Sequence, residues 1–278
     1  MASTKVEQRC SQMARSIRVH SLRMIHAAGS GHPGGSFSAA DILAALYSDC
    51  LKFRPDEPDW LDRDRLVYSK GHGCPALYAA MAVAGYFPVD ELIGLRKLDC
   101  RFQGHPDRRK IPALEASTGS LGQGLSIALG MALARRLSGQ DYHVYCVIGD
   151  GETDEGQIWE AALYAGAHGV DHLIGITDYN KIQNDDYSEN ILPKRDLPEK
   201  WAAFGWHPIE IDGHDISAIR GALEEARGVS GKPVMIVAHT VKGKGVSFME
   251  DEPGWHGKAP NDEEFVRAMA ELGEEVSV

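Results

Sequence analysis

Two short polar stretches each follow an apolar, strand-like run. In VIGDGETDEG, Asp150 ends the run of residues 144–149 and Gly151 follows it, and in LIGITDYN the run that starts at residue 173 ends at Asn180. If both runs are neighbouring strands, Asp150 and Asn180 meet at one sheet edge as two oxygen ligands. Mg²⁺ prefers hard oxygens and completes its octahedron with phosphate and water. The pair predicts a Mg²⁺–diphosphate site, although a lone Asp-Gly or Asn-Lys more often only caps a turn.

Four histidines lie in glycine- or proline-rich contexts that suit loops better than helices or strands. They are His32 in SGHPGG, His72 in KGHGCP, His105 in QGHPDR and His256 in GWHGKA. Imidazoles on loops can bind phosphate or sugar hydroxyls and move protons near neutral pH. Zinc is the competing ligand, but no two of the four have a metal-ligand spacing such as H-x₃₋₅-H. We therefore expect these rings to line a pocket.

The stretch STGSLGQGLSIALGMALA is a glycine-rich turn that opens a helix. Bare amides at a helix N-terminus suit a diphosphate. The spacing is G-x-x-G-x-G and not the G-x-G-x-x-G of a dinucleotide fold, and a P-loop is absent. Close packing of small residues accounts for Gly130 and Ala132 but not for the turn of residues 119–124.

Short apolar runs alternate with segments of helical spacing. The runs are residues 66–69, 144–148, 173–177, 209–211 and 233–240, and the helical segments are residues 12–27, 39–51, 121–137, 157–167 and 216–227. The runs are rich in Val and Ile without clean alternation, as in strands covered on both faces. They predict an α/β fold, a doubly wound, mostly parallel sheet with helices on both faces. We expect residues 1–278 to form one domain with a loop-rich insertion at about 53–118, and ligands at the carboxyl ends of the strands.

The composition narrows the class of protein. The chain has 278 residues, 43% of them apolar, and 40 acidic against 29 basic residues give a formal charge of −11. This charge argues against binding to nucleic acid or to an anionic membrane. No apolar signal core and no run of roughly 18 apolar residues is present, so we expect a cytoplasmic protein. The five cysteines form no C-x-x-C motif, which favours reduced thiols over a metal or redox role.

Together these stretches resemble the transketolase family. The GDG at Asp150 followed by DYNKIQ at Asn180 resembles the thiamine-diphosphate signature, and SGHPGG, SKGHG, GHPD, STGSLGQG and GDGETDEG resemble transketolase motifs in order, from about residue 10 to 260. Transketolases have three domains, and this chain resembles only the first, the diphosphate-binding domain. The resemblance therefore implies the N-terminal subunit of a split, two-subunit transketolase, and KGKGVSFMEDEPGWHGKAP fits split enzymes better than fused ones.

By position, the resemblance also implies a role for individual residues. Asp150 and Asn180 would bind Mg²⁺ (or Ca²⁺ or Mn²⁺) through their side chains, and Ile182 through its backbone carbonyl. The residues implied to contact thiamine diphosphate are His72, Gly119, Ser120, Leu121, Asp150, Gly151, Asn180 and His256. The residues implied to act in catalysis are His32, His105 and His256, which would handle sugar hydroxyl protons, and Glu155, which would communicate between two active sites. For Glu155 the alternative is an acid favoured by the macrodipole at a helix N-terminus.

The implied reaction moves a two-carbon glycolaldehyde unit from a ketose or ketose phosphate to an aldose. The cofactor supplies the carbanion chemistry. In this family the glutamate that starts the cycle lies in the pyrimidine-binding domain. The implied partner is therefore a second subunit with the pyrimidine-binding and C-terminal domains, in a heterotetramer, and the chain alone should be inactive.

Three residues depart from the family pattern, so the donor and acceptor sugars are not determined, and two alternative functions remain. Ser120 stands where many fused enzymes have proline, and Asn184 and Asp186 stand where an apolar residue and glycine are expected.

One alternative is another thiamine-diphosphate enzyme, such as a deoxyxylulose-phosphate synthase or the α subunit of a 2-oxo acid dehydrogenase. The histidines favour transketolase, because sugar hydroxyls need imidazoles that a 2-oxo acid does not. The other alternative is a non-catalytic assembly subunit.

Overall fold

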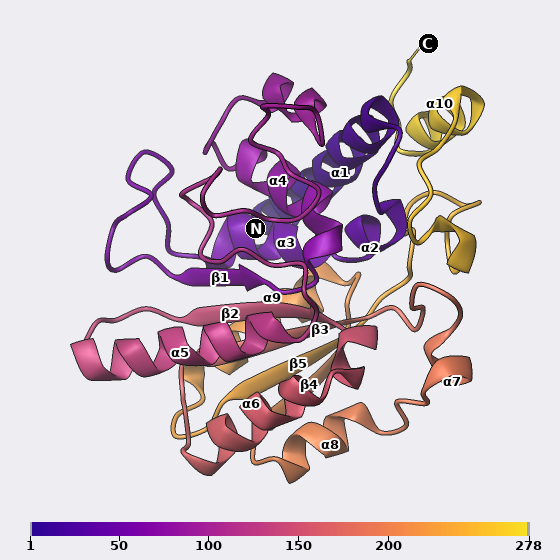
Figure 1. The fold of residues 1–278 in the computed structure, drawn as a ribbon. Coiled ribbons are helices and arrows are strands. Elements are labelled where there is room, and N and C mark those ends of the chain that lie inside the picture. Colours follow the sequence, from indigo (N-terminus) through magenta and orange to yellow (C-terminus); the bar gives the residue numbers. More distant parts are fainter. Residues whose placement is uncertain (1, 277–278) are drawn as a thin grey trace.

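Five parallel strands form the centre of the molecule (Figure 1). The computed structural model describes residues 2–276. The strands are β1 (Arg65–Tyr68), β2 (Val144–Gly149), β3 (Leu173–Tyr179), β4 (His207–Asp212) and β5 (Val234–His239). They pair in the order β1-β2-β3-β5-β4, and every pair is parallel. Each run predicted as a strand is found, which confirms the predicted α/β fold.

Helices cover both faces of the sheet (Figure 1). One layer consists of α5 (Gln123–Ser138), α6 (Gly156–Ala167) and α8 (Leu197–Ala203), and the other of α1 (Ala2–Ala28), α3 (Ala40–Ala45), α4 (Cys74–Val83) and α9 (Ile216–Gly228). Along β2, Val144, Cys146 and Ile148 pack in the first layer, whereas Tyr145 and Val147 pack in the second. Both sides of the strand are therefore apolar, which is why its sequence shows no alternation.

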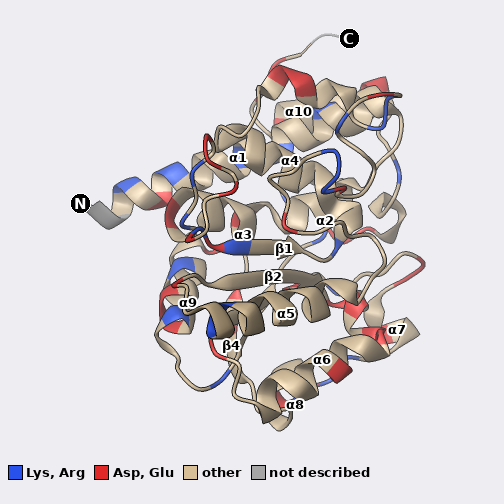
Figure 2. Cartoon of the chain, turned by 60° about the vertical axis from the view of Figure 1, so that its left-hand side comes forward, with Lys and Arg blue, Asp and Glu red and all other residues tan. Residues whose placement is uncertain are grey.

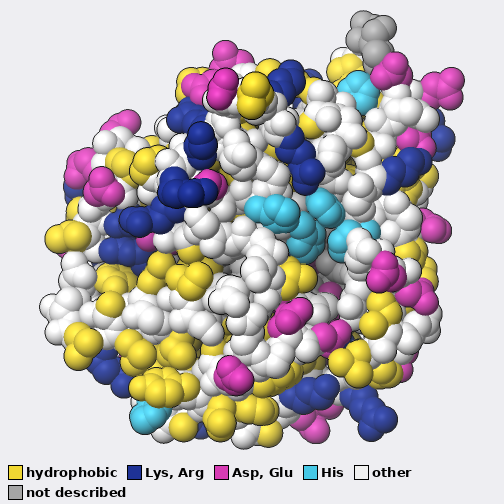
Figure 3. Space-filling view, in the orientation of Figure 1, with side chains coloured by type: hydrophobic (Ala, Val, Ile, Leu, Met, Phe, Trp, Pro, Cys, Tyr) yellow, Lys and Arg dark blue, Asp and Glu magenta, His cyan; other side chains and the backbone are white. Residues whose placement is uncertain are grey.

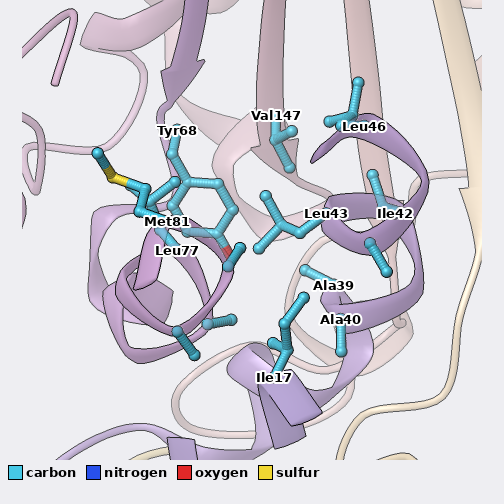
Figure 4. Close-up of a cluster of buried hydrophobic side chains, with 14 of the residues drawn as sticks. Ile17, Ala39, Ala40, Ile42, Leu43, Leu46, Tyr68, Leu77, Met81 and Val147 are labelled. Atoms are coloured by element: carbon cyan, nitrogen blue, oxygen red, sulfur yellow. The ribbon is translucent and has the colours of Figure 1, made fainter. Parts of the chain in front are cut away.

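The second layer contains a dense apolar cluster next to the strand ends that lead to the polar stretches (Figure 4). Ile17 of α1, Leu43 of α3 and Leu77 of α4 meet Tyr68 and Val147 of the strands. Each of these five side chains is at most 3% exposed. Close packing of this kind leaves little freedom to the strand ends. The core thus positions the residues that follow β1 and β2.

The helices differ from the sequence prediction in several places. Helix α1 begins at Ala2 rather than near residue 12, and α3 ends at Ala45 and continues as a π-helical turn (Leu46–Cys50). The helices that were not predicted are α2 (Pro33–Ser38), α4, α7 (Ser188–Ile191), α8 and α10 (Asp262–Glu271). Residues 53–118 contain β1 and α4 as well as turns and loops. Helix α4 has no amphipathic signal because nine of its ten residues are buried.

Charged side chains lie mainly on helices and connecting loops, and the ribbons of β1 and β2 carry few (Figure 2). None of the helices within residues 2–276 is long and apolar enough to cross a membrane.

Two glycines of α5 have opposite surroundings. A Cβ at Gly124 would lie 2.3 Å from Ser69 Oγ and 2.9 Å from Ser69 Cα, so α5 starts in direct contact with the end of β1. Gly130 is exposed, and a Cβ there would have no neighbour within 4 Å. The expectation that close packing accounts for Gly130 is therefore wrong, whereas Ala132 is buried as expected.

We predict opposite effects of alanine at these two positions. Gly124→Ala should lower the free energy of unfolding by about 1–3 kcal/mol, because α5 must move away from Ser69. Gly130→Ala, the matched control in the same helix, should raise it by about 0.5–1 kcal/mol through helix propensity. Urea denaturation of the isolated chain, followed by circular dichroism, measures both. A stabilising effect of Gly124→Ala would contradict the packing constraint.

Candidate functional site

A cavity of about 220 Å³ lies at the carboxyl ends of β2 and β3. Eight residues singled out from the sequence line it: His72, Leu121, Asp150, Gly151, Glu155, Asn180, Ile182 and His256. The four that do not line it are His32, His105, Gly119 and Ser120. In Figure 3, histidine side chains gather in a hollow near the middle of the visible face, with acidic side chains below them.

Asp150 and Asn180 follow neighbouring parallel strands, as the sequence predicts. They are only 1% and 5% exposed. Burial raises the pKa of Asp150 to about 6, although its Oδ2 accepts a hydrogen bond of 2.7 Å from Ser188 Oγ. The Ile182 N–H donates to Asn180 Oδ1 at 3.2 Å, so this amide and Ile182 belong to one tight turn. A carboxylate, an amide oxygen and a nearby carbonyl are a donor set that fits Mg²⁺.

Asp178, near the end of β3, is the centre of a buried hydrogen-bond network that includes Lys70 and Asn180 of the cavity. Its carboxylate pairs with Lys70 Nζ and accepts hydrogen bonds from Ser38 Oγ at 2.6 Å and from Thr240 Oγ1. Asn180 Nδ2 also donates to it, at 3.2 Å. Burial acts to raise the pKa of Asp178, but Lys70 and the hydroxyl donors outweigh it and lower that pKa. Because Asn180 uses its Nδ2 on this carboxylate, its Oδ1 is the atom that can reach a metal.

A second buried ammonium group, Lys242, contacts the implied metal ligand Ile182. Lys242 is 1% exposed, and its Nζ donates to Ile182 O at 2.8 Å. The same Nζ lies 2.6 Å from His256 Nδ1. Burial, reinforced by the charge of Lys70, lowers the pKa of Lys242 to about 7. While Lys242 donates to Nδ1, the ring proton of His256 lies on Nε2.

Three of the four predicted histidines form one cluster. The ring centroids are 5.3 Å apart for His32 and His72, 5.5 Å for His32 and His256, and 5.3 Å for His72 and His256. Burial, together with nearby positive charges, lowers the pKa of His32 to about 4 and that of His256 to about 3, and that of His72 lies well below its usual value. All three rings are therefore neutral at pH 7.

His105 borders a separate, open hollow of about 430 Å³. Its ring lies against the glycine-rich turn, since a Cβ at Gly119 would be 2.9 Å from His105 Cγ. Gly119 has a φ of 136°, a conformation that side chains rarely adopt. The structure thus joins His105 to the turn rather than to the other three rings.

Glu152 holds the glycine-rich turn against the sheet. It is 2% exposed, and its carboxylate accepts hydrogen bonds from Gly122 N at 2.7 Å, Gly149 N at 3.1 Å and Ser69 Oγ. Gly122 is the N-cap of α5 and has a φ of 86°. The first acid after Asp150 therefore positions the start of the helix.

Of the next two acids, Asp154 binds the segment that follows β3, and Glu155 lies beside the cavity. Asp154 pairs with Lys194, whose side chain is 3% exposed, and accepts a hydrogen bond of 2.8 Å from Gln183 Nε2. Glu155 is the N-cap of α6, but its side chain makes no capping hydrogen bond and is exposed beside the cavity. Asp154 thus ties that segment to the start of α6.

Four buried residues of the site were not singled out from the sequence: Lys70, Glu152, Asp178 and Lys242. Lys70 and Asp178 lie within the quoted SKGHG and LIGITDYN stretches, so their position in a motif was the available signal. Nothing local marks Lys242 as buried, because a lysine in a stretch such as VKGKG is normally exposed.

Comparisons with known proteins agree with this geometry. The family model described as transketolase, thiamine diphosphate binding domain, matches residues 9–277. The chain is 49% identical over 262 residues to the 6-deoxy-6-sulfo-D-fructose transketolase subunit SqwG of Clostridium sp. (strain MSTE9), covering 94% of this chain and 95% of that subunit. It is 41% identical over 245 residues to an apulose-4-phosphate transketolase subunit of Actinobacillus succinogenes, covering 88% of each.

Longer relatives match only in part. The transketolase from Leishmania mexicana superposes with a TM-score of 0.91 at 35% identity, over 96% of this chain and 41% of its own. The bovine transketolase-like protein 2 is 40% identical, over 88% of this chain and 39% of its own length. These matches confirm the predicted family and the predicted resemblance to the subunits of split transketolases. The chain belongs to the transketolase family and carries its thiamine diphosphate-binding domain.

Proposed function

We propose that this chain is the cofactor-binding subunit of a two-subunit transketolase whose ketose donor carries an anionic group. The observation that carries the proposal is the meeting of Asp150, Asn180 and Ile182 with two rings of the histidine cluster, His72 and His256, around one cavity at the carboxyl ends of the strands. The chain also has about the length of the subunit-type relatives, since it covers 95% and 88% of two of them.

In this cavity the metal would bind to oxygen atoms, and the diphosphate would bind beside positively charged side chains. Asp150 and Asn180 would hold Mg²⁺, or Ca²⁺ or Mn²⁺, through side-chain oxygens, and Ile182 through its carbonyl. Gly151, Leu121, His72 and His256 would contact the diphosphate and the rest of thiamine diphosphate, with Gly119 and Ser120 behind them on the turn. Lys70 and Lys242 add the positive charge that a diphosphate requires.

The histidines would handle the protons of the sugar. When bound, thiamine diphosphate supplies the carbanion chemistry that breaks the carbon–carbon bond of a ketose. A neutral imidazole has one donor and one acceptor nitrogen. His32 can therefore accept a hydroxyl proton at one nitrogen and donate at the other, whereas His256, whose Nδ1 accepts from Lys242, would offer its Nε2–H as a donor to a sugar hydroxyl. His105 would act from the glycine-rich turn, and Glu155 would face the partner and its second active site.

The relatives' names motivate the choice of donor and partner. One is named for 6-deoxy-6-sulfo-D-fructose and another for apulose-4-phosphate, and both sugars carry an anionic group. The fused relatives are more than twice as long as this chain. The partner is accordingly a subunit with the pyrimidine-binding and C-terminal domains, and the pair assembles as a heterotetramer.

A coupled transfer assay tests this function. The chain, thiamine diphosphate and Mg²⁺ are incubated with a phosphorylated, a sulfonated or a neutral ketose and an aldose acceptor, alone and with the subunit encoded next to the chain. We expect transfer only in the mixture and only with the anionic donors. Activity of the chain alone would contradict an active site that needs residues of both subunits. An inactive mixture that still binds cofactor would favour an assembly role.

Loss of the carboxylate at position 150 should abolish metal-dependent cofactor binding. Asp150→Asn keeps the shape but removes the charge, so thiamine diphosphate should bind at least about 100-fold more weakly in Mg²⁺. Asp212→Asn is the matched control, since Asp212 also ends a strand but is exposed. Isothermal titration calorimetry with and without Mg²⁺ measures the difference. Equal affinities of Asp150→Asn and the unaltered chain would remove Asp150 from the metal site.

The neutral histidines should make the isolated chain sensitive to acid. The pKa of His32 is about 4 when folded, below the value of about 6.5 for an unfolded histidine. The unfolded state therefore binds the proton first, and stability is lost as the pH falls from 6.5 towards 4. His32→Asn should reduce the loss of unfolding free energy between pH 7 and pH 5 by about 1–2 kcal/mol.

Urea denaturation at the two pH values measures this loss. His168→Asn, at an exposed position outside the site, is the control and should leave the pH dependence unchanged. An unchanged pH dependence in His32→Asn would show that this ring is not held neutral by the fold.

A further inference from the structure

We propose that Arg96 is a positioning residue that ties the segment carrying His32 to the segment carrying His105, and so sets where the two sugar-facing imidazoles stand. This inference rests on the proposed function, and its test distinguishes the two. Arg96 lies outside every motif singled out from the sequence.

The backbone at Arg96 adopts an uncommon conformation. Its φ is 60°, in the left-handed region that residues with a Cβ seldom populate. Its N–H donates to Phe102 O at 2.8 Å, which closes the loop of residues 96–102. Such conformations persist where the surroundings hold them, and they cluster at functional sites. The loop therefore presents the Arg96 side chain in a defined direction.

The side chain bridges two distant segments. Its Nη1 donates to Ser30 Oγ at 3.0 Å, two residues before His32. On the other side, a Cβ at Gly104 would lie 2.9, 3.0 and 3.1 Å from Cζ, Nε and Nη2 of Arg96. Distances this similar mean that the flat guanidinium faces Gly104, so a side chain at this position would displace it. Gly104 directly precedes His105.

The guanidinium also adds a fixed positive charge beside both rings. Burial is the main cause of the lowered pKa of His32 and of His105, and Arg96 is the next cause for each. The other titratable groups near His32 are Lys70, His72, His105, Lys242 and His256. Those near His105 on its own loop are Asp107 and Arg109. Because arginine does not lose its proton near neutral pH, Arg96 adds to the effect of burial in lowering the pKa of both rings, which are then neutral and able to accept a hydroxyl proton.

Two substitutions separate the geometry from the charge. Arg96→Lys keeps the charge but cannot face Gly104 and reach Ser30 with one planar group. Arg96→Gln removes the charge as well. Lys97→Gln removes an adjacent exposed charge and is the control. Ser30→Ala removes only the hydrogen bond, so it tests the bridge even if Arg96→Gln disturbs the fold.

Nuclear magnetic resonance on the histidine-labelled chain gives a readout that does not depend on activity. The signals are assigned with His32→Asn and His105→Asn. In Arg96→Gln we expect the pKa values of both histidines to rise by about half a unit to one unit, whereas in Arg96→Lys they should rise less. Lys97→Gln should leave them unchanged.

Kinetics of the complete two-subunit enzyme give the second readout. In Arg96→Gln and Arg96→Lys, kcat should fall by about 10- to 100-fold, because the imidazoles of His32 and His105 are no longer held in position for the reaction. The affinity for thiamine diphosphate should change less than about twofold. Ser30→Ala should show a smaller loss in the same direction. The acidic limb of the pH profile should move to higher pH in Arg96→Gln.

The proposal is overturned if Arg96→Gln leaves both histidine titrations in place, or if its kcat falls no further than that of Lys97→Gln. A parallel loss of cofactor affinity would also overturn it, since Arg96 would then support the whole site. If the unaltered mixture shows no transfer, the proposed function fails, whereas shifted titrations in Arg96→Gln would still support the electrostatic influence of Arg96 on the two rings.

Discussion

The buried carboxylate of Asp178 is the constraint on which the rest of the site depends. An ionised carboxylate away from water is costly unless it is paired and hydrogen-bonded. Here Lys70 follows β1, Ser38 belongs to α2 and Thr240 follows β5, and all three bind Asp178 on β3. Satisfying one charge therefore fixes three distant segments around one cavity. The same network turns the amide of Asn180, so its influence extends to the implied metal site.

Around this carboxylate, buried side chains of both charges line the cavity. Two acids, Asp150 and Glu152, and two lysines, Lys70 and Lys242, line it, and all four are at most 2% exposed. In a medium of low polarity such groups interact strongly, and their protonation depends on each other. The raised pKa of Asp150 and the lowered pKa of Lys242 both result mainly from burial. A divalent metal and a diphosphate bring charges of both signs, so the two together suit this arrangement better than either ion alone.

Much of the fold and part of the site could be predicted from the sequence. The strands are short, apolar and repeated, and Asp150 and Asn180 follow two of them directly, so local pattern sufficed. The burial of Lys70 and Lys242 could not be predicted, because it arises from segments far apart in the chain that pack together. Helix α4 was missed for the related reason that it is buried on all sides. Asn261 and Glu264 at α10 do form a capping box, a local signal that was available.

The distribution of the site along the chain has a consequence for how the protein folds. The cavity and the histidine cluster draw on residues from His32 to His256: residues 149–184 supply most of the cavity lining, but Lys70, Lys242 and the histidines come from segments far from it in the sequence. Contacts between residues so far apart in sequence form slowly, because long loops must close first. The cavity is therefore complete only when the last strand and the segment after it have joined the sheet. A ligand of this cavity would bind only fully folded chains, and it would therefore raise the free energy of unfolding.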